Sequence, residues 1–436
     1  MKPGTQTERG VEVRAGYKLT EVGVIPEEWE VRTLGSITSL LTNGFVGTAT
    51  SAYVDGEDGV LYVQGYNVQE NGFNFHGIKR VSRAFHARNQ KSCLQASDLL
   101  TIQTGDIGVT AAVPAQLIGA NCHALVISRL HDTTSDPHYY SQYFNSETGR
   151  SAFKKIETGT TMKHLNCGDM KELFLPAPPL PEQRAIAAAL SDVDALLGGL
   201  DRLIAKKRDL KQAAMQQLLT GHTRLPGFGG EWKVRPLASA VASLDAGVSV
   251  NSVEHGKPLR SGEPCILKTS AIFDGCFDPE ECKLIDRRDI SRAKLSPRRD
   301  TIIISRMNTP NLVGEVGYVP DDFPTLNLPD RLWMTRFDPN SDVCARWLAY
   351  VMSSPQVKEN IKGLATGTSG SMKNIGKGKL LALQLEFPAG KEQSAIAAVL
   401  SDMDTELSKL VARRDKTRDL KQAMMQELLT GRIRLV

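Results

Sequence analysis

The chain of 436 residues is too long for one compact core, and length alone predicts about three domains. Its hydrophobic fraction of 41% and charged fraction of 23% are those of a globular protein, which excludes collagen-like and wholly disordered chains. The net charge of +4 is mildly basic and too weak by itself to indicate a nucleic-acid partner.

Residues 1–20 form a short N-terminal extension in which charged residues and glycines stand where an export signal would have an apolar core. The sequence contains no run of about 18 apolar residues, so no membrane span is predicted. The 7 cysteines are scattered without a CxxC pair, which favours free thiols over a metal cluster. These features predict a cytoplasmic protein with no membrane partner and no metal site.

Residues 21–179 contain short β-type runs among turn signals, for example at 60–63, 99–102 and 124–127. A helical stretch is predicted near 139–155. This region is therefore expected to be a mixed α/β (α+β) domain with a curved sheet.

Residues 180–225 are predicted to form a long helix that begins near Pro181 and Glu182 and ends near Gly221. Apolar residues recur here at alternating steps of three and four, which makes a narrow seam typical of paired long helices. The seam residues of this segment are Ile186, Leu190, Val193, Leu197, Leu200 and Ile204.

Residues 226–388 repeat the pattern of the first domain, with strands predicted at 265–267 and 301–304 and a helical stretch near 345–362. A second mixed α/β domain is expected. Residues 389–436 then form a second long helix, whose seam residues are Ile396, Leu400, Met403, Leu407 and Leu410.

The two long helices are copies of one segment. Residues 182–225 align without a gap with residues 392–435, at an offset of 210, and 27 of 44 positions are identical. This duplication predicts a pseudo-two-fold repeat in which the helices pair as an antiparallel coiled coil. Arg413 and Arg414 replace Leu203 and Ile204, so the middle of the pair is expected to depart from symmetry. The alternative is that each helix packs as an ordinary core helix within its own half.

Basic residues gather in equivalent places of the two divergent regions. Such clusters suit phosphate contacts, because each neutralised phosphate adds affinity through counterion release. Solvated surface charge is the alternative interpretation. The candidates are Lys79, Arg80, Arg83 and Arg88 in the first region, and Arg287 and Arg288 in the second.

Several motifs together resemble the specificity (S) subunit of a Type I restriction–modification system. They are the opening KLTEVGVIPEEW at 18–29, the twofold EQxAIA, the twofold LKQA followed by LLTG, and RLPGF at 224–228 before Glu231 and Trp232. The resemblance covers almost the whole chain after the first 16 residues, in the family's order of elements.

The resemblance implies two target-recognition domains joined by two long helices that form an antiparallel coiled coil. Each domain would read one half of a bipartite site in double-stranded DNA. The helices would set the spacer and dock two methyltransferase (M) subunits, and restriction (R) subunits would complete the nuclease. No cofactor is expected in this chain, because S-adenosylmethionine, ATP and magnesium would belong to the partner subunits.

The resemblance also places the family's glycine-containing loop within residues 98–114 and 300–320. Gln103 and Thr104 are expected to correspond to Ser305 and Arg306 at a strand end. Arginine, asparagine and glutamine are efficient readers of base edges. Base-contact candidates are Gln64, Gln103, Thr104, Lys268, Arg306 and Asn308, and phosphate-contact candidates are Thr161, Lys163, Ser371 and Lys373.

No catalytic residue is predicted. The nearest approach to an amino-methyltransferase motif is Asp136-Pro137-His138-Tyr139, which lacks the second proline and an upstream glycine-rich loop. No phosphate-binding P-loop or workable nuclease carboxylate set is present. The chain is thus expected to be a non-catalytic recognition subunit. The alternatives are an S-like subunit of a bifunctional Type II-related enzyme and a coiled-coil scaffold that does not bind DNA.

Overall fold

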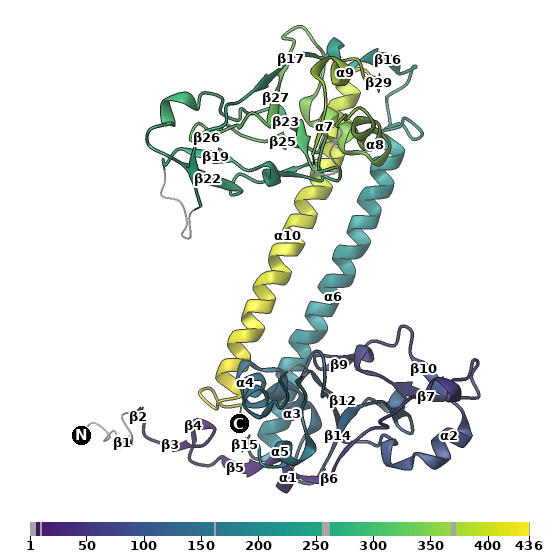
Figure 1. Ribbon diagram of the computed structural model, residues 1–436, viewed down its shortest axis with the longest axis vertical. Coiled ribbons are helices and arrows are strands. Elements are labelled where there is room, and N and C mark those ends of the chain that lie inside the picture. The colour runs from purple at the N-terminus through teal and green to yellow at the C-terminus, as the bar shows by residue number, and fades with distance from the viewer. Residues whose placement is uncertain (1–5, 9–10, 161–162, 255–261, 368–371, 436) are drawn as a thin grey trace. The chain divides into compact units, whose positions relative to one another are not determined.

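The computed structural model describes residues 6–8, 11–160, 163–254, 262–367 and 372–435 (Figure 1). The chain divides into two compact units. Unit 1 consists of Met1–Asp201 and Ala412–Val436, and unit 2 of Arg202–Val411. Each unit therefore contains one α/β domain and parts of both long helices, α6 (Leu180–Leu218) and α10 (Gly390–Leu428).

The first domain contains both helices and strands. Its helices are α1 (Leu34–Ile37), α2 (Arg83–Arg88), α3 (Pro137–Asn145), α4 (Glu147–Ile156) and α5 (Cys167–Lys171). Its strands are β1 (Gln6–Glu8), β2 (Val11–Val13), β3 (Tyr17–Thr20), β4 (Gly23–Pro26), β5 (Glu30–Thr33), β6 (Thr38–Asn43), β7 (Val60–Val63), β8 (Val68–Gln69), β9 (Gly72–Phe73), β10 (Lys79–Val81), β11 (Asp98–Ile102), β12 (Thr110–Ala112), β13 (Asn121–Cys122), β14 (Leu125–Leu130) and β15 (Phe174–Ala177).

A four-stranded antiparallel sheet in the order β12-β11-β14-β6 forms the centre of this domain. Successive residues of a strand point to opposite faces of its sheet. Leu99 accordingly packs with Tyr139 and Phe144 of α3, whereas Leu100 packs with Val63 of the second sheet, β10-β7-β13. Because both faces are covered, every residue of β11 is buried.

The second domain has the helices α7 (Ala345–Ser353), α8 (Pro355–Gly363) and α9 (Lys377–Leu381). Its strands are β16 (Lys233–Pro236), β17 (Val241–Ala246), β18 (Ser252–Val253), β19 (Cys265–Leu267), β20 (Ile272–Phe273), β21 (Cys276–Phe277), β22 (Cys282–Ile285), β23 (Thr301–Ser305), β24 (Met307–Asn308), β25 (Val316–Val319), β26 (Leu326–Asn327), β27 (Leu332–Phe337), β28 (Lys373–Asn374) and β29 (Gln384–Phe387).

The second domain repeats the topology of the first. Its central sheet runs β17-β27-β23-β25, which matches β6-β14-β11-β12, and its second sheet contains β22-β19-β26 in the place of β10-β7-β13. In both second sheets the last pair is parallel and the other is antiparallel. The prediction of two mixed α/β domains with two long helices is confirmed.

Each predicted helical stretch beside the sheets consists of two helices. The hydroxyl of Ser146 accepts the backbone N–H of Gly149 and thereby caps α4 directly after α3. At the same place in the second domain, α8 begins with Pro355, whose fixed φ suits the first helical position. In both domains the helical stretch is therefore interrupted, because the residue before the second helix has an extended backbone.

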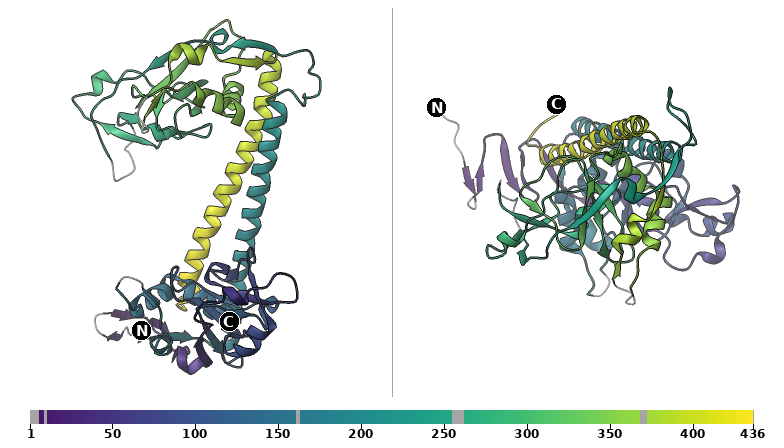
Figure 2. Two further views of the ribbon diagram at one scale, coloured as in Figure 1. Left: turned by 45° about the vertical axis from the view of Figure 1, so that its right-hand side comes forward. Right: turned by 90° about the horizontal axis from the view of Figure 1, so that it is seen from above.

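The long helices α6 and α10 run side by side (Figure 1, Figure 2). The core of unit 1 contains Ile186 and Leu190 from the start of α6 together with Leu428 from the end of α10. The core of unit 2 contains Ile396 from the start of α10 and Leu218 from the end of α6. Each core thus holds opposite ends of the two helices, so the helices are antiparallel.

Both long helices end as the sequence predicts, at a glycine with positive φ. Gly221 has φ 69° and Gly431 has φ 70°. A Cβ atom at Gly221 would lie 3.3 Å from the ring of Trp232, and one at Gly431 would lie 2.5 Å from Pro26 and 3.2 Å from Trp29. Glycine is therefore needed for both the turn and the close packing.

Candidate nucleic-acid interface

An ion pair with a buried glutamate joins the start of one long helix to the segment that follows the other, at each end of the helix pair. In unit 1, Nε and Nη2 of Arg434 donate to the two carboxylate oxygens of Glu182 at 2.5 and 2.8 Å. The Glu182 side chain is 0% exposed and also accepts a hydrogen bond from Trp29 Nε1 at 2.9 Å. Charge-assisted bidentate pairs of this kind hold a fixed geometry.

The same pair recurs in unit 2. Arg224 donates to both oxygens of Glu392 at 2.5 and 2.6 Å, and this bonding raises the pKa of the Arg224 guanidinium. Arg224 lies about 6 Å from the ring of Trp232, as Arg434 does from Trp29. Glu182 and Glu392, like Arg224 and Arg434, lie at matching positions of the repeat, but the sequence predicted no pairing between them.

A second repeated contact joins the two helices to each other and to the domains. Lys421 bridges Asp194 at 2.6 Å, and Lys211 bridges Asp404 at 2.5 Å. Asp194 also accepts a hydrogen bond from Gln142 of α3 at 2.7 Å. The phenol of Tyr350 in α7 donates in the same way to Asp404 at 2.6 Å. In each unit, therefore, one carboxylate contacts both the other long helix and a helix of the α/β domain.

The middle of the helix pair departs from this symmetry, as the sequence predicts. Lys207 bridges Glu406 at 2.7 Å, and Arg414 bridges Asp201 at 3.7 Å. The pair of Arg414 cannot recur 210 positions earlier in the chain, because the buried Ile204 stands there in place of the arginine. The seam is therefore apolar on α6 and partly ionic on α10.

The predicted seam residues face inward to different extents. The six buried ones are Ile186, Leu190, Leu200, Ile204, Ile396 and Leu400. The half-buried ones are Val193, Leu197, Met403, Leu407 and Leu410. Four of the buried residues, Ile186, Leu190, Ile396 and Leu400, belong to domain cores, whereas Leu200 and Ile204 are buried outside these cores.

Three of the predicted DNA contacts lie together at a strand end of unit 2. The short strand β24 pairs with β28, which places Asn308 opposite Lys373. Arg306 lies directly before β24, and its guanidinium is 5.7 Å from the ring centre of the buried Trp333. Asn308 is buried and donates to the Ser305 hydroxyl at 3.2 Å.

The equivalent strand end of unit 1 has a different register from the expected one. Leu165 donates its backbone N–H to the carbonyl of Gln103, as Ile375 does to that of Arg306. Gln103 therefore corresponds to Arg306, and the expectation that it corresponds to Ser305 is wrong by one residue. The error arose because β23 extends to Ser305, whereas the predicted strand stopped at residue 304.

The remaining candidates of these loops differ in placement. Thr104 is exposed, and the Lys163 ammonium bridges Glu157 at 3.0 Å. Lys373 donates to the carbonyl of Gly367 at 2.9 Å. Thr161 and Ser371 lie outside the described residues.

The two predicted basic clusters are unequal. Lys79, Arg83 and Arg88 are exposed in the first domain, whereas Arg80 donates to the Gly59 carbonyl at 2.7 Å. In the second domain Arg287 is exposed, but Arg288 bonds Asp286 through two nitrogens. The hydrogen bonds from Arg288 lower the pKa of Asp286 to about 2, so this pair stays charged and mutually occupied.

Gln64 and Lys268 lie at matching strand ends of the second sheets, directly after β7 and β19. Gln64 forms an amide–phenol cluster, in which it donates to Tyr53 and accepts from Tyr66. Lys268 instead lies between Glu254 at 3.5 Å and Glu281 at 3.8 Å. The two domains therefore present different hydrogen-bonding chemistry at the same position of the fold.

Within the described residues, no group of three or more histidine, cysteine, aspartate or glutamate side chains could hold a metal ion. The helices of the described residues also include none long and apolar enough to cross a membrane.

Comparison with known proteins shows similarity to one family. Residues 26–205 match the family model described as the Type I restriction modification DNA specificity domain. The chain is 22% identical over 436 residues to the Type I restriction enzyme MjaVIII specificity subunit of Methanocaldococcus jannaschii, with 94% of each chain covered. The match to the specificity domain covers residues 26–205, and similarity to whole Type I specificity subunits extends over most of the chain.

Other specificity subunits resemble the chain over most of its length. The Type I restriction enzyme EcoKI specificity subunit of Escherichia coli (strain K12) is 21% identical over 393 residues, covering 86% of this chain and 82% of that relative. The crystal structure of a Type I S subunit from M. genitalium matches with a TM-score of 0.59 and 17% identity, covering 94% of this chain and 97% of that one. The shared fold thus includes both domains and both long helices.

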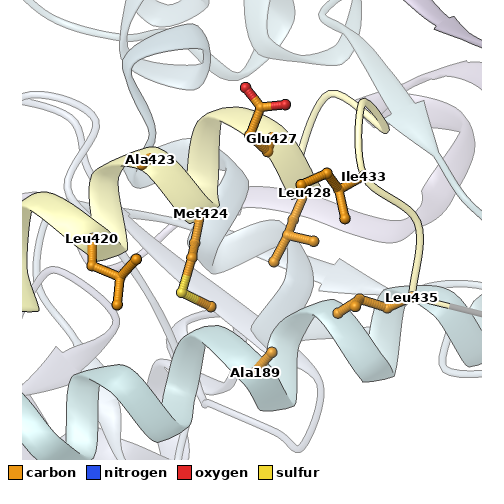
Figure 3. Close-up of a pocket in the computed structure, with 8 residues that line it drawn as sticks. All are labelled: Ala189, Leu420, Ala423, Met424, Glu427, Leu428, Ile433 and Leu435. Carbon is orange, nitrogen blue, oxygen red and sulfur yellow. The ribbon is translucent and has the colours of Figure 1, made fainter.

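Unit 1 has a largely apolar groove, where the end of α10 faces α6 (Figure 3). The groove has a volume of about 340 Å³, and Ala189 of α6 forms its floor below Met424. Leu420 on its wall is 56% exposed. Leu210, the counterpart of Leu420 in the repeat, is 48% exposed in unit 2.

Proposed function

We propose that this chain is a specificity subunit that reads a bipartite site in double-stranded DNA, with residues 21–179 reading one half-site and residues 226–388 the other. The repeated ion pair carries the proposal, because Glu182 with Arg434 and Glu392 with Arg224 join the helix ends beside each domain in the same way. A repeated ion pair and divergent strand ends fit two readers of different sequences. The DNA between the half-sites would be left unread.

The strand ends of the second sheets and central sheets supply suitable reading chemistry. Arginine contacts guanine through two hydrogen bonds, and glutamine contacts adenine in the same manner. Arg306 and Gln103 occupy equivalent positions in the two units, as do Lys268 and Gln64. The exposed Lys79, Arg83, Arg88 and Arg287 would add sequence-independent phosphate contacts.

The helix pair is proposed to set the spacer and to dock two M subunits. Each helix has 39 residues, and repeated ion pairs join the two helices within each unit. Leu210 and Leu420 are exposed apolar residues of the twofold LKQA segment. A repeated apolar surface fits a partner that is present twice. R subunits would join the complex, and S-adenosylmethionine, ATP and magnesium would bind in the partners.

Arg306 and Arg287 are expected to contribute to DNA binding in different ways. Arg306→Ala should weaken binding to the cognate duplex about tenfold and relax selectivity in one half-site, because a base contact carries sequence information. Arg287→Ala should weaken binding to all duplexes alike and lower the slope of log K against log salt by about 1, because a phosphate contact releases counterions. Salt titrations of both variants in complex with M check this. Equal, salt-independent binding by all three proteins would contradict the proposed DNA reading.

A further inference from the structure

Each unit has a loop that leaves the edge strand of the central sheet and crosses a strand of the second sheet. In unit 1 the loop follows β6, and the backbone N–H of Phe45 donates to the Cys122 carbonyl in β13 at 2.8 Å. In unit 2 the loop follows β17, and the N–H of Val248 donates to the Leu328 carbonyl, just after β26, at 3.2 Å. Since β13 and β26 are equivalent strands, the two crossings are equivalent.

A glycine makes each crossing possible. A Cβ atom at Gly44 would lie 2.5 Å from Cys122 Sγ and 2.6 Å from its carbonyl oxygen. At Gly247 it would lie 1.6 Å from the Leu328 carbonyl oxygen. No other residue fits such a close backbone approach without displacing the strand below. The backbone that follows each glycine is therefore held in place by the sheet.

Both held loops present an exposed valine. Val46 is 68% exposed and Val248 is 43% exposed. A single exposed aliphatic residue needs no explanation. Val248 directly follows its glycine, in the place of Phe45, and Val46 lies one residue further along its loop. The two equivalent loops therefore each present an exposed valine, at neighbouring positions, which is consistent with a shared use for an apolar contact.

Polar cavities border the two loops. In unit 1 a cavity of about 420 Å³ is lined by Val46 together with Asn43, Arg88 and Lys91. In unit 2 a cavity of about 540 Å³ begins at Ser249, next to Val248. The second cavity is lined by two lysines and two glutamates, Lys268, Lys283, Glu254 and Glu281.

We infer that these two loops are base-reading elements, in which Val46 and Val248 each contact the methyl group of a thymine in the major groove. The inference rests on the proposed function, because it assigns readers to the two half-sites. The thymine methyl is the apolar feature that a base pair presents in this groove. A loop already fixed by its glycine loses little conformational freedom on binding, which favours a specific contact.

The neighbouring side chains fit the same use and distinguish the two loops. Arg88 and Lys91 can contact phosphates or guanine beside Val46. In unit 2, Lys283 bridges Glu254 at 2.8 Å, so carboxylates as well as cations are available beside Val248. A carboxylate can accept a hydrogen bond from the amino group of cytosine. The bases next to each contacted thymine are therefore expected to differ between the half-sites.

A double substitution in protein and DNA tests the contact. The full chain is co-expressed with its M subunit, the methylated site is mapped, and duplexes of that site are made with deoxyuridine replacing single thymines. Deoxyuridine lacks only the methyl group. Deoxyuridine at one thymine of one half-site should weaken DNA binding by the wild-type complex about fivefold. The same replacement in the DNA should not change DNA binding by the complex that contains Val46→Ala. Val248→Ala should lose the response to one thymine of the other half-site.

Ile118→Ala is the matched control, because Ile118 is an exposed aliphatic residue of the first domain outside the loop and its cavity. It should respond to deoxyuridine as the wild type does. The inference is overturned if Val46→Ala keeps the full response, if neither half-site contains a sensitive thymine, or if the variant weakens M binding instead. A wild-type complex with no bipartite site would overturn the proposed function itself. Circular dichroism confirms that the exposed substitutions leave the fold intact.

Discussion

Replacing Arg434 by methionine is expected to lower the free energy of unfolding by about 3 kcal/mol, because it leaves the buried Glu182 carboxylate without its cation. Trp29 would then supply the remaining hydrogen bond to that carboxylate, together with whatever water enters. Methionine keeps most of the volume of the arginine stem, so lost packing contributes little. Equilibrium urea denaturation followed by circular dichroism measures the change.

Arg432→Met is the matched control for this substitution. Arg432 is 54% exposed and bridges Glu427, another partly exposed side chain, at 3.3 Å. Exposed pairs of this kind contribute about 0–1 kcal/mol, so the control should unfold close to the wild type. If Arg434→Met and Arg432→Met lowered the free energy of unfolding by the same amount, the buried ion pair would not be what holds the end of the chain to the first domain.

Leu420→Arg is expected to reduce the number of M subunits on the chain from two to one. The substitution places a charge in the apolar groove of unit 1, where a docked partner would have to bury it (Figure 3). We expect binding at that groove to weaken roughly 100-fold. Leu210→Arg should have the same effect at the other end, and the double variant should bind no M subunit. Light scattering of the purified complexes gives the stoichiometry.

Gln422→Arg is the control for the added charge, because Gln422 is an exposed residue of the same helix that does not line the groove. This variant should retain two M subunits. Two M subunits on the double variant Leu210→Arg/Leu420→Arg would contradict docking at these surfaces.

The architecture could be predicted because its signals are local or repeated. The alternation of apolar steps over 186–204 and 396–410 indicates paired helices without any knowledge of their partners. Gly221 and Gly431 indicate where each helix ends, since the turn needs a positive φ. The duplication of the long helix predicts that both domains share one topology, as the equivalent strands β11 and β23 illustrate.

The side-chain partners could not be predicted, because they join residues far apart in the chain. Arg434 meets Glu182 across 252 positions, and neither residue is unusual in its local sequence. The sequence predicts Arg288 as a free phosphate ligand, whereas in the structure its guanidinium bonds Asp286. The strand-end correspondence failed by one residue because hydrogen bonding to Ser305 decides where β23 ends.

The loops of Val46 and Val248 illustrate a third limit. In the sequence Gly44 and Gly247 are two of 37 glycines, and neither has a positive φ that would mark a special turn. Their importance lies in the strand that passes beneath each of them. Only the equivalent crossings over Cys122 and Leu328 show that the two loops match.

The most direct test of bipartite reading is a modification map. The full chain is co-expressed with its M subunit in a host free of other adenine methylation, and methylated adenines are located by modification-sensitive sequencing. Two short specific sequences separated by a spacer of constant length and free sequence are the predicted result. Replacing residues 21–179 with another recognition domain should change one of them and preserve the other and the spacer. A single contiguous motif, or methylation by this chain alone, would contradict the account.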